Sequence, residues 1–209
     1  MRRTEATPVV PLEAGAGPEN PPCPACGEPL FGWIGEQRGL AGPVRRCESC
    51  GLGVIGEAGD AEAALRELDR RRKGEAIRIE NRAGFACSLG GAGWAGLHPE
   101  ARHLFTGEAV RRLVARRDQV VKRSRPRPLA SLAIAWQTLL NSVTFGRNLA
   151  LGALRSYSAA PAERPWQRRI DALASIVLAI PALAIALVVE LAAAPLGRSA
   201  VVEVRLQLL

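Results

Sequence analysis

The chain has 209 residues, of which 48% are hydrophobic and 23% charged, so it can hold one small metal module and one modest domain but little more. Its formal net charge of +8 comes from 26 arginines and two lysines set against 20 acidic residues. Such a bias can reflect genome composition as easily as function. The total charge therefore neither indicates nor excludes a nucleic-acid partner.

The first 22 residues are rich in proline and small side chains and contain no apolar core of signal-peptide length. This composition predicts a disordered tail over residues 1–22 and gives no sign of secretion. We therefore expect a cytoplasmic protein. In a reducing cytosol, paired cysteines bind metal more often than they form disulfides.

Four of the five cysteines form two close pairs with the pattern C-x2-C-x20-C-x2-C, and a glycine follows each pair. Four thiolates on two tight turns can surround one Zn²⁺ tetrahedrally, and this spacing is typical of a zinc ribbon. Two redox or disulfide pairs are the alternative. We predict a zinc ribbon over residues 23–56 with four metal ligands: Cys23, Cys26, Cys47 and Cys50.

Three glycines beside the second pair, Gly51, Gly53 and Gly56, match the G-x-G-x-x-G pattern of nucleotide-binding loops. That pattern indicates such a loop only where a strand precedes it and a helix follows. Here a Cys-x-x-Cys precedes it. We interpret residues 52–55 as a short strand after the second cysteine turn, with Gly51 allowing the turn.

Other candidate ligands are weaker. His98 and His103 have metal-like spacing, but a four-cysteine site is already full, and a histidine pair in a loop is more often structural. Cys87, the odd cysteine, is predicted to be a small buried or half-buried side chain. No catalytic residue is assigned.

The middle of the chain has the pattern of an α/β protein. Helices are predicted over residues 61–73 and 107–117, the second capped by Thr106. Strands are predicted at 76–80 and 119–123, and a long glycine-rich loop begins at Asn81. A strand-like run, VVEVRLQLL, closes the chain.

A basic run over residues 111–127 holds eight positive side chains against one aspartate. It is either a solvated helix face followed by a solvated strand or a phosphate-facing patch. No aromatic side chain interleaves with the arginines, so base stacking is unsupported. Anionic lipid headgroups fit better, because the following residues are apolar.

Two uncharged stretches follow, and we predict hydrophobic helices over 129–157 and 170–195. Residues 172–189 are uncharged for 18 residues, which is near the lower limit for crossing a bilayer, and Pro181 interrupts them. If this segment spans, Arg164, Arg168 and Arg169 place its N-terminal side in the cytoplasm. We favour a helix packed on a sheet or bound to a surface, because a following strand beyond the membrane would lack a neighbour.

Several short motifs occur together in order: CPACG at 23–27, CESCGL at 47–52, IEN at 79–81, Trp94, RHLFT at 102–106 and the terminal GRSAVVEVRL. This order resembles zinc-ribbon class I S-adenosylmethionine-dependent methyltransferases. The resemblance implies that 76–80, 119–123 and 201–206 are the last three strands of a Rossmann-like sheet, with 201–206 antiparallel between the others. It also places His103 and Trp94 in the substrate-side loop, where we expect structural roles.

The chain departs from that family between the ribbon and the first helix. The family carries there the half of the sheet that binds the cofactor, whereas this chain has only residues 53–60. We therefore predict an α/β (α+β) fold. It consists of a zinc ribbon followed, over residues 61–209, by a small three-stranded mixed sheet with helices, like the C-terminal half of such a methyltransferase. S-adenosylmethionine binding by the isolated chain is not expected.

The absent half would also leave the strand at 76–80 without a neighbour on one side. Proteins seldom leave such an edge open, because it templates pairing with other chains. We expect this edge to pair with a second copy or a partner, or to be covered by the helices around 132–154.

Three functions are compatible with these features. The first is a non-catalytic zinc-binding protein with a degenerate methyltransferase-like domain, acting through a protein partner, a homo-oligomer or a membrane surface. The second is a membrane-anchored zinc-ribbon adaptor at the inner face of the membrane. The third is a methyltransferase completed by a second chain.

Overall fold

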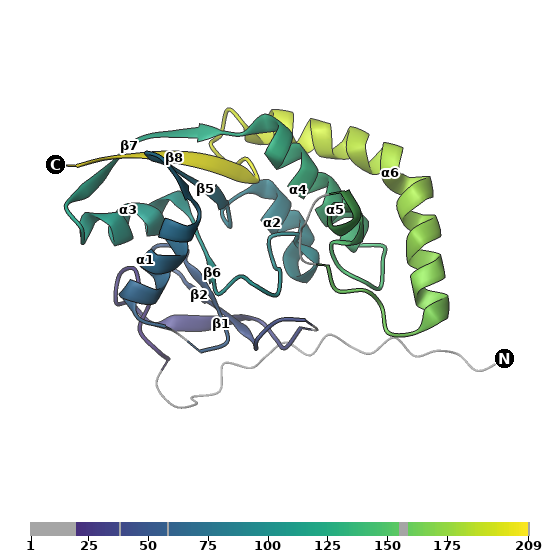
Figure 1. The fold of residues 1–209 in the computed structure, drawn as a ribbon, viewed down its shortest axis with the longest axis horizontal. Helices are drawn as coiled ribbons and strands as arrows, with labels where there is room; N and C mark the ends of the chain where they lie inside the picture. Colours follow the sequence, from purple (N-terminus) through teal and green to yellow (C-terminus); the bar gives the residue numbers. More distant parts are fainter. Residues whose placement is uncertain (1–19, 38, 58, 155–158, 209) are drawn as a thin grey trace.

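The computed structural model describes residues 20–37, 39–57, 59–154 and 159–208 as two antiparallel sheets with helices (Figure 1). Of the predicted tail, residues 1–19 lie outside this part of the chain. Pro22 is within it and forms an isolated bridge with Pro29, so the ordered structure begins before the first cysteine.

The first sheet carries the cysteines. Its strands are ordered β1 (Leu30–Ile34), β2 (Val44–Cys47), β3 (Gly53–Ile55) and β6 (His103–Leu104), with every neighbouring pair antiparallel. Strand β3 confirms the short strand predicted after the second cysteine pair. Strand β6 arrives from much later in the chain, so the ribbon sheet is completed by a segment outside 23–56.

The first helix is shorter than predicted. Helix α1 (Ala61–Arg70) starts at Asp60, whose side chain accepts from the backbone N–H of Ala63 at 2.7 Å. It ends before Lys73 because β4 (Arg72–Lys73) folds back on β5 (Ala76–Glu80) as a hairpin. Gly74, at φ +62°, lies in the turn of that hairpin, where the left-handed backbone favours glycine.

The second sheet is ordered β4–β5–β8–β7, with β7 at Gln119–Pro126 and β8 at Val201–Leu208. The predicted position of the last strand between the other two, antiparallel to both, is confirmed. The prediction of a three-stranded mixed sheet is wrong. The two parallel strands are not neighbours, so every pair is antiparallel, and β4 adds a fourth strand.

The edge of the strand at 76–80 is covered in part by a strand that the sequence did not predict. Strand β4 covers its start, pairing Arg72 with Ile77 and Lys73 with Ala76. Within the described residues β4, and not the helices around 132–154, provides that pairing, while pairing with a second copy or a partner stays a prediction. A two-residue strand suffices to cover the first part of this edge, and short edge strands are a common protection against pairing between chains.

Helices α1 and α3 (Gly107–Ala115) pack on one face of the second sheet, and Figure 1 shows its other face bare except where the start of α4 (Pro128–Asn141) meets the start of β8. Thr106 caps α3 as predicted, by accepting from the N–H of Ala109 at 3.0 Å. The buried side chains between helices and sheet include Leu65, Phe105 and Leu113. Each such side chain contributes roughly 1.5–3 kcal/mol of hydrophobic stabilisation.

The predicted glycine-rich loop and the first apolar segment form several short elements. The loop contains α2 (Phe85–Gly90) and the 3₁₀ turn η1 (Gly91–Gly93). The predicted 129–157 helix is divided into α4 (Pro128–Asn141) and α5 (Leu149–Leu154), and its last residues, 155–157, lie outside the described part of the chain. Asn141 and Asn148 cause the division. Their side chains bond each other at 2.9 Å, and Asn148 adopts a left-handed backbone (φ +55°) that ends helical continuity.

Helix α6 (Pro165–Ala193) is the longest element and begins five residues before the predicted 170–195 helix. Pro181 lies inside it, and the helix bends along its length in Figure 1. It contacts α4 through small side chains such as Ala182 and Ala186. The expectation that it packs on a sheet is wrong, because most of its large apolar side chains face outward: Ile176 and Ile180 are 75% and 79% exposed.

Candidate metal centre

The two cysteine pairs lie in turns with the same hydrogen bonds. The N–H of Gly27 donates to the carbonyl of Cys23 at 2.8 Å, and the N–H of Gly51 donates to that of Cys47 at 3.1 Å. Both glycines have a left-handed backbone, at φ +82° and +75°. A side chain at either position would be strained, which explains why a glycine follows each pair.

These turns bring the four thiols together. The sulfur atoms of the predicted ligands Cys23, Cys26, Cys47 and Cys50 all lie within 4.8 Å of one another, and within the described residues this is the one such group of metal-binding side chains. Cys23 Sγ lies 3.5 Å from Cys50 Sγ, and Cys26 Sγ lies 3.4 Å from Cys47 Sγ. None of the four forms a disulfide.

The spacing of the sulfurs suits a tetrahedral ion. Zinc–thiolate bonds of about 2.3 Å in a regular tetrahedron separate sulfurs by roughly 3.8 Å. The sulfur pairs at 3.5 and 3.4 Å are slightly closer than that value, so small movements would admit an ion. An oxidised disulfide would require sulfur atoms about 2.05 Å apart, and none of the four cysteines forms one in this structure.

The ionisation of the thiols is coupled. Hydrogen bonding from Cys50 lowers the pKa of Cys23 to about 5, although burial opposes the shift. The same contact raises the pKa of Cys50, and burial raises that of Cys26. The first ionised thiolate therefore makes the next ionisation harder. A cation among the sulfurs would remove that penalty, since thiolates are the form that binds metal.

The second cysteine turn is fixed to the rest of the molecule by side chains from outside the ribbon. Thr106 Oγ1 donates to the carbonyl of Cys50 at 2.6 Å, and Arg82 Nη1 donates to the carbonyl of Gly51 at 2.8 Å. The Arg82 guanidinium also lies 4.5 Å from the ring centre of Trp33 in β1. The metal centre is thus attached to the N-terminus of α3 and to the loop after β5.

The other predicted candidates lie outside the sulfur cluster. Cys87 is buried as predicted, and desolvation raises its pKa to about 12. His98 does not join the cluster, and burial lowers its pKa. His103 is buried in β6, and Trp94 is fully buried beside Ala95 and Leu97. Their burial is what a structural role requires.

One buried polar network could not be predicted from the sequence. Glu67 on α1 accepts from the backbone N–H of His103 at 3.1 Å, lies 2.7 Å from His103 Nδ1, and pairs with Arg71 at 2.8 Å. Arg71 also forms an ion pair with Glu80 on β5. This network joins α1 to both sheets. Glu67 stands among ordinary surface residues of a helix pattern, so no sequence signal distinguishes it.

Comparison of the chain with protein-family models, with curated proteins and with solved structures finds no match. Its chemistry is therefore inferred from its own residues.

Proposed function

We propose that this chain is a zinc-binding protein in which one structural Zn²⁺ is held by Cys23, Cys26, Cys47 and Cys50, and which acts without catalysis through contacts at a membrane surface. The four converging thiols carry the zinc proposal. Four protein ligands fill a tetrahedral coordination sphere, whereas catalytic zinc keeps one position open. The role of the ion is accordingly structural.

The proposed ion would stabilise more than the ribbon. Three of the four cysteines belong to the same hydrophobic cluster as the residues between α1, α3 and the second sheet. Thr106 connects the second turn directly to the cap of α3. Metal binding at such a centre contributes to folding free energy, so its effect is expected to extend into the packed body.

Metal content tests the zinc proposal. The full chain, purified under reducing conditions without an affinity tag that binds metal, should contain one zinc ion per chain by elemental analysis. Iron is the competing occupant, because a tetrahedral set of four thiolates also suits iron. Iron in place of zinc, or no metal at all, would overturn the proposal.

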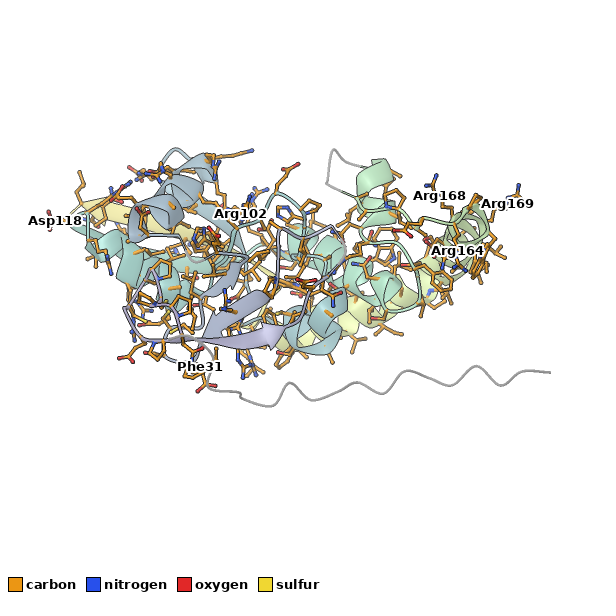
Figure 2. The ribbon with its side chains drawn as sticks, turned by 90° about the horizontal axis from the view of Figure 1, so that it is seen from below. Phe31, Arg102, Asp118, Arg164, Arg168 and Arg169 are labelled. Carbon is orange, nitrogen blue, oxygen red and sulfur yellow. The ribbon has the colours of Figure 1, made fainter. Side chains whose placement is uncertain are left out.

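Helix α6 favours membrane contact. Within the described residues it is the one helix long and apolar enough to cross a membrane, and its outward side chains are mostly large and apolar. A continuous exposed apolar surface along a helix of 29 residues usually marks an interaction site. Figure 2 shows Arg164, Arg168 and Arg169 together near the start of this helix, where they could meet anionic headgroups.

Contacts at both ends of α6 support a helix that lies on the membrane rather than across it. Near its start, the Asp171 carboxylate accepts from the N–H groups of Phe145 and Gly146 at 2.7 and 2.9 Å. Near its end, Glu190 accepts from the N–H of Ala200 at 3.1 Å. In its middle, Trp136 Nε1 donates to the carbonyl of Ala179 at 2.9 Å. A spanning helix would lose these buried contacts.

Extraction from cell membranes tests this arrangement. We expect a tagged chain to fractionate with membranes and to be released by alkaline carbonate, which strips surface-bound proteins. Retention after carbonate treatment would favour the spanning, membrane-anchored adaptor. Recovery entirely in the soluble fraction would contradict both membrane forms and leave a protein partner or a homo-oligomer, which light scattering distinguishes.

We take the resemblance to methyltransferases as a sign of common ancestry and not of activity. The position of β8 between β5 and β7, antiparallel to both, agrees with what that resemblance implies and supports a degenerate methyltransferase-like domain. An active methyltransferase completed by a second chain is the alternative. Calorimetric titration with S-adenosylmethionine tests both: sub-millimolar binding by this chain alone would contradict a non-catalytic role, and the two-chain enzyme would bind only once the second chain is added.

A further inference from the structure

The bare face of the second sheet carries an array of arginines from three neighbouring strands. Arg78 on β5 lies directly opposite Glu203 on β8, and Glu203 lies opposite Arg125 on β7. In the next row, Arg205 on β8 lies opposite Arg123 on β7. The sequence separates these side chains widely, and the pairing of the strands brings them onto one surface.

The charges in this array are unbalanced. Arg127 and Arg205 both approach the one carboxylate, Glu203, at 3.5 and 3.8 Å. In this part of the face four arginines, Arg78, Arg125, Arg127 and Arg205, gather with one carboxylate, Glu203, and Arg123 lies opposite Arg205 on the neighbouring strand. Like charges opposite each other destabilise a sheet, and an anionic ligand would relieve that repulsion.

The arginines line a cleft rather than a flat surface. A cavity of about 570 Å³ opens between the sheet and the start of α4, and its walls include Arg78, Arg125, Arg127 and Arg205. Leu129 forms part of its rim and is 81% exposed. In Figure 1 the later part of α6 lies along the same upper edge of the molecule as the bare face of the sheet.

We propose that this cleft binds the phosphate of an anionic phospholipid headgroup while α6 contacts the acyl region. The guanidinium fork matches phosphate oxygens, which suits several arginines converging on one cleft. A lipid is favoured over nucleic acid because no described residue lining the cleft is aromatic, so bases have nothing to stack on. A lipid is favoured over free phosphate because the cleft opens beside exposed apolar side chains.

This inference rests on the proposed membrane function and deepens it. The test is co-sedimentation of the full chain with vesicles of phosphatidylcholine alone and of phosphatidylcholine mixed with phosphatidylglycerol. The cleft variant replaces three arginines with glutamine: Arg78, Arg125 and Arg205. The control variant makes the same change in charge on the opposite side of the sheet, at three exposed positions on α1 and after α3: Arg66, Arg70 and Arg116.

The cleft variant should bind the anionic vesicles at least tenfold more weakly than wild type, because each arginine near an anionic surface contributes about a fivefold effect. The control variant should bind clearly better than the cleft variant. Glu203→Gln should bind anionic vesicles more tightly than Glu62→Gln, which removes one acidic charge from α1. Misfolding of a variant would not specifically increase its binding to anionic vesicles. The comparison of Glu203→Gln with Glu62→Gln therefore remains informative even if the arginine variants are unstable.

The possible failures are distinguishable. If wild type binds neither kind of vesicle, the proposed membrane function itself is wrong. If wild type binds anionic vesicles and the cleft and control variants are equally weakened, the headgroup cleft is wrong while the membrane function stands. Full competition by millimolar inorganic phosphate would assign the cleft to free phosphate, and tighter binding to a DNA duplex than to anionic vesicles would assign it to nucleic acid. Either result overturns the lipid proposal.

Discussion

Thr106 Oγ1 donates a 2.6 Å hydrogen bond to the carbonyl oxygen of Cys50, and the Thr106 hydroxyl oxygen itself accepts from the N–H of Ala109. One buried hydroxyl therefore joins a candidate metal ligand to the first turn of α3. The position of the Thr106 methyl group also explains why Gly51 follows this cysteine, because a Cβ at residue 51 would approach Thr106 Cγ2 to 2.9 Å. The ribbon and the helix share one attachment point.

Replacing Thr106 with Val should destabilise the zinc-loaded chain by about 2 kcal/mol, since it removes a helix cap and leaves the Cys50 carbonyl without this donor. Thr106→Ser keeps the hydroxyl, so its free energy of unfolding should fall much less. Urea unfolding followed by circular dichroism measures both. A loss in Thr106→Ser as large as that in Thr106→Val would show that the methyl group matters as much as the hydrogen bonds and would contradict this prediction.

The two glycines of the cysteine turns should respond differently to alanine. Gly27→Ala meets no atom within 4 Å, so it should cost only the backbone strain of a left-handed residue, about 1 kcal/mol. Gly51→Ala carries the same strain and in addition the clash with Thr106, so it should cost more. Thermal unfolding of the two variants gives the comparison. A larger effect at Gly27 would contradict the attachment described above.

Removal of metal should unfold the ribbon and loosen α3. A strong chelator is expected to abolish amide protection in β1 to β3 and to reduce it in the first turn of α3, because Thr106 couples the two. Protection in α4 should persist. Hydrogen exchange with mass spectrometry resolves these segments. Cys47→Ser should reproduce the chelated pattern, whereas Cys87→Ser should leave the zinc content unchanged.

Glu67 should contribute to stability at neutral pH and lose that contribution in acid. Burial raises the pKa of Glu67, but the His103 hydrogen bond and the Arg71 charge together outweigh burial and hold the pKa below its ordinary value. A carboxylate with a lowered pKa stabilises the fold above about pH 4.3 and ceases to do so as the pH falls through its folded value. Glu67→Gln should therefore be less stable than wild type at pH 7.

The difference in unfolding free energy between wild type and Glu67→Gln should narrow as the pH is lowered below about 4.3. Metal loss in acid affects both proteins, so the difference between them isolates the carboxylate. Urea titrations across this range measure it. A difference that stays constant with pH would show that the glutamine disturbs packing rather than charge.

The apolar face of α6 should determine vesicle binding. Ile176→Glu and Ile180→Glu each place a charge on that face, and each should weaken binding to phosphatidylcholine vesicles severalfold. Leu89→Glu is the matched control, because Leu89 on α2 is 64% exposed but lies outside α6. Flotation of the full chain with vesicles compares them. An equal effect at Leu89 would indicate general loss of stability.

Local chemistry in the sequence determined the cysteine turns, the cap at Thr106 and the three long strands. These features depend on a few neighbouring positions: the spacing of the thiols, a glycine after each pair and the alternation of apolar residues. They can therefore be recognised without knowing the tertiary structure. The buried state of Cys87 followed from similar reasoning. The same kind of pattern predicted a helix over 61–73 that is too long, because Lys73 belongs to a hairpin. It also predicted one helix over 129–157, because the polar turn that includes Asn148 has no local signal.

The tertiary structure alone decided how these elements meet. Pairing of β5, β7 and β8 aligned Arg78, Glu203 and Arg125, which lie far apart in the chain, and it left their face uncovered. Packing against α4 selected the small residues of α6 and left Ile176 and Ile180 outside, although the uncharged run looks alike on every side. Cross-strand register and the choice of a buried helix face depend on partners distant in sequence, which no local pattern encodes.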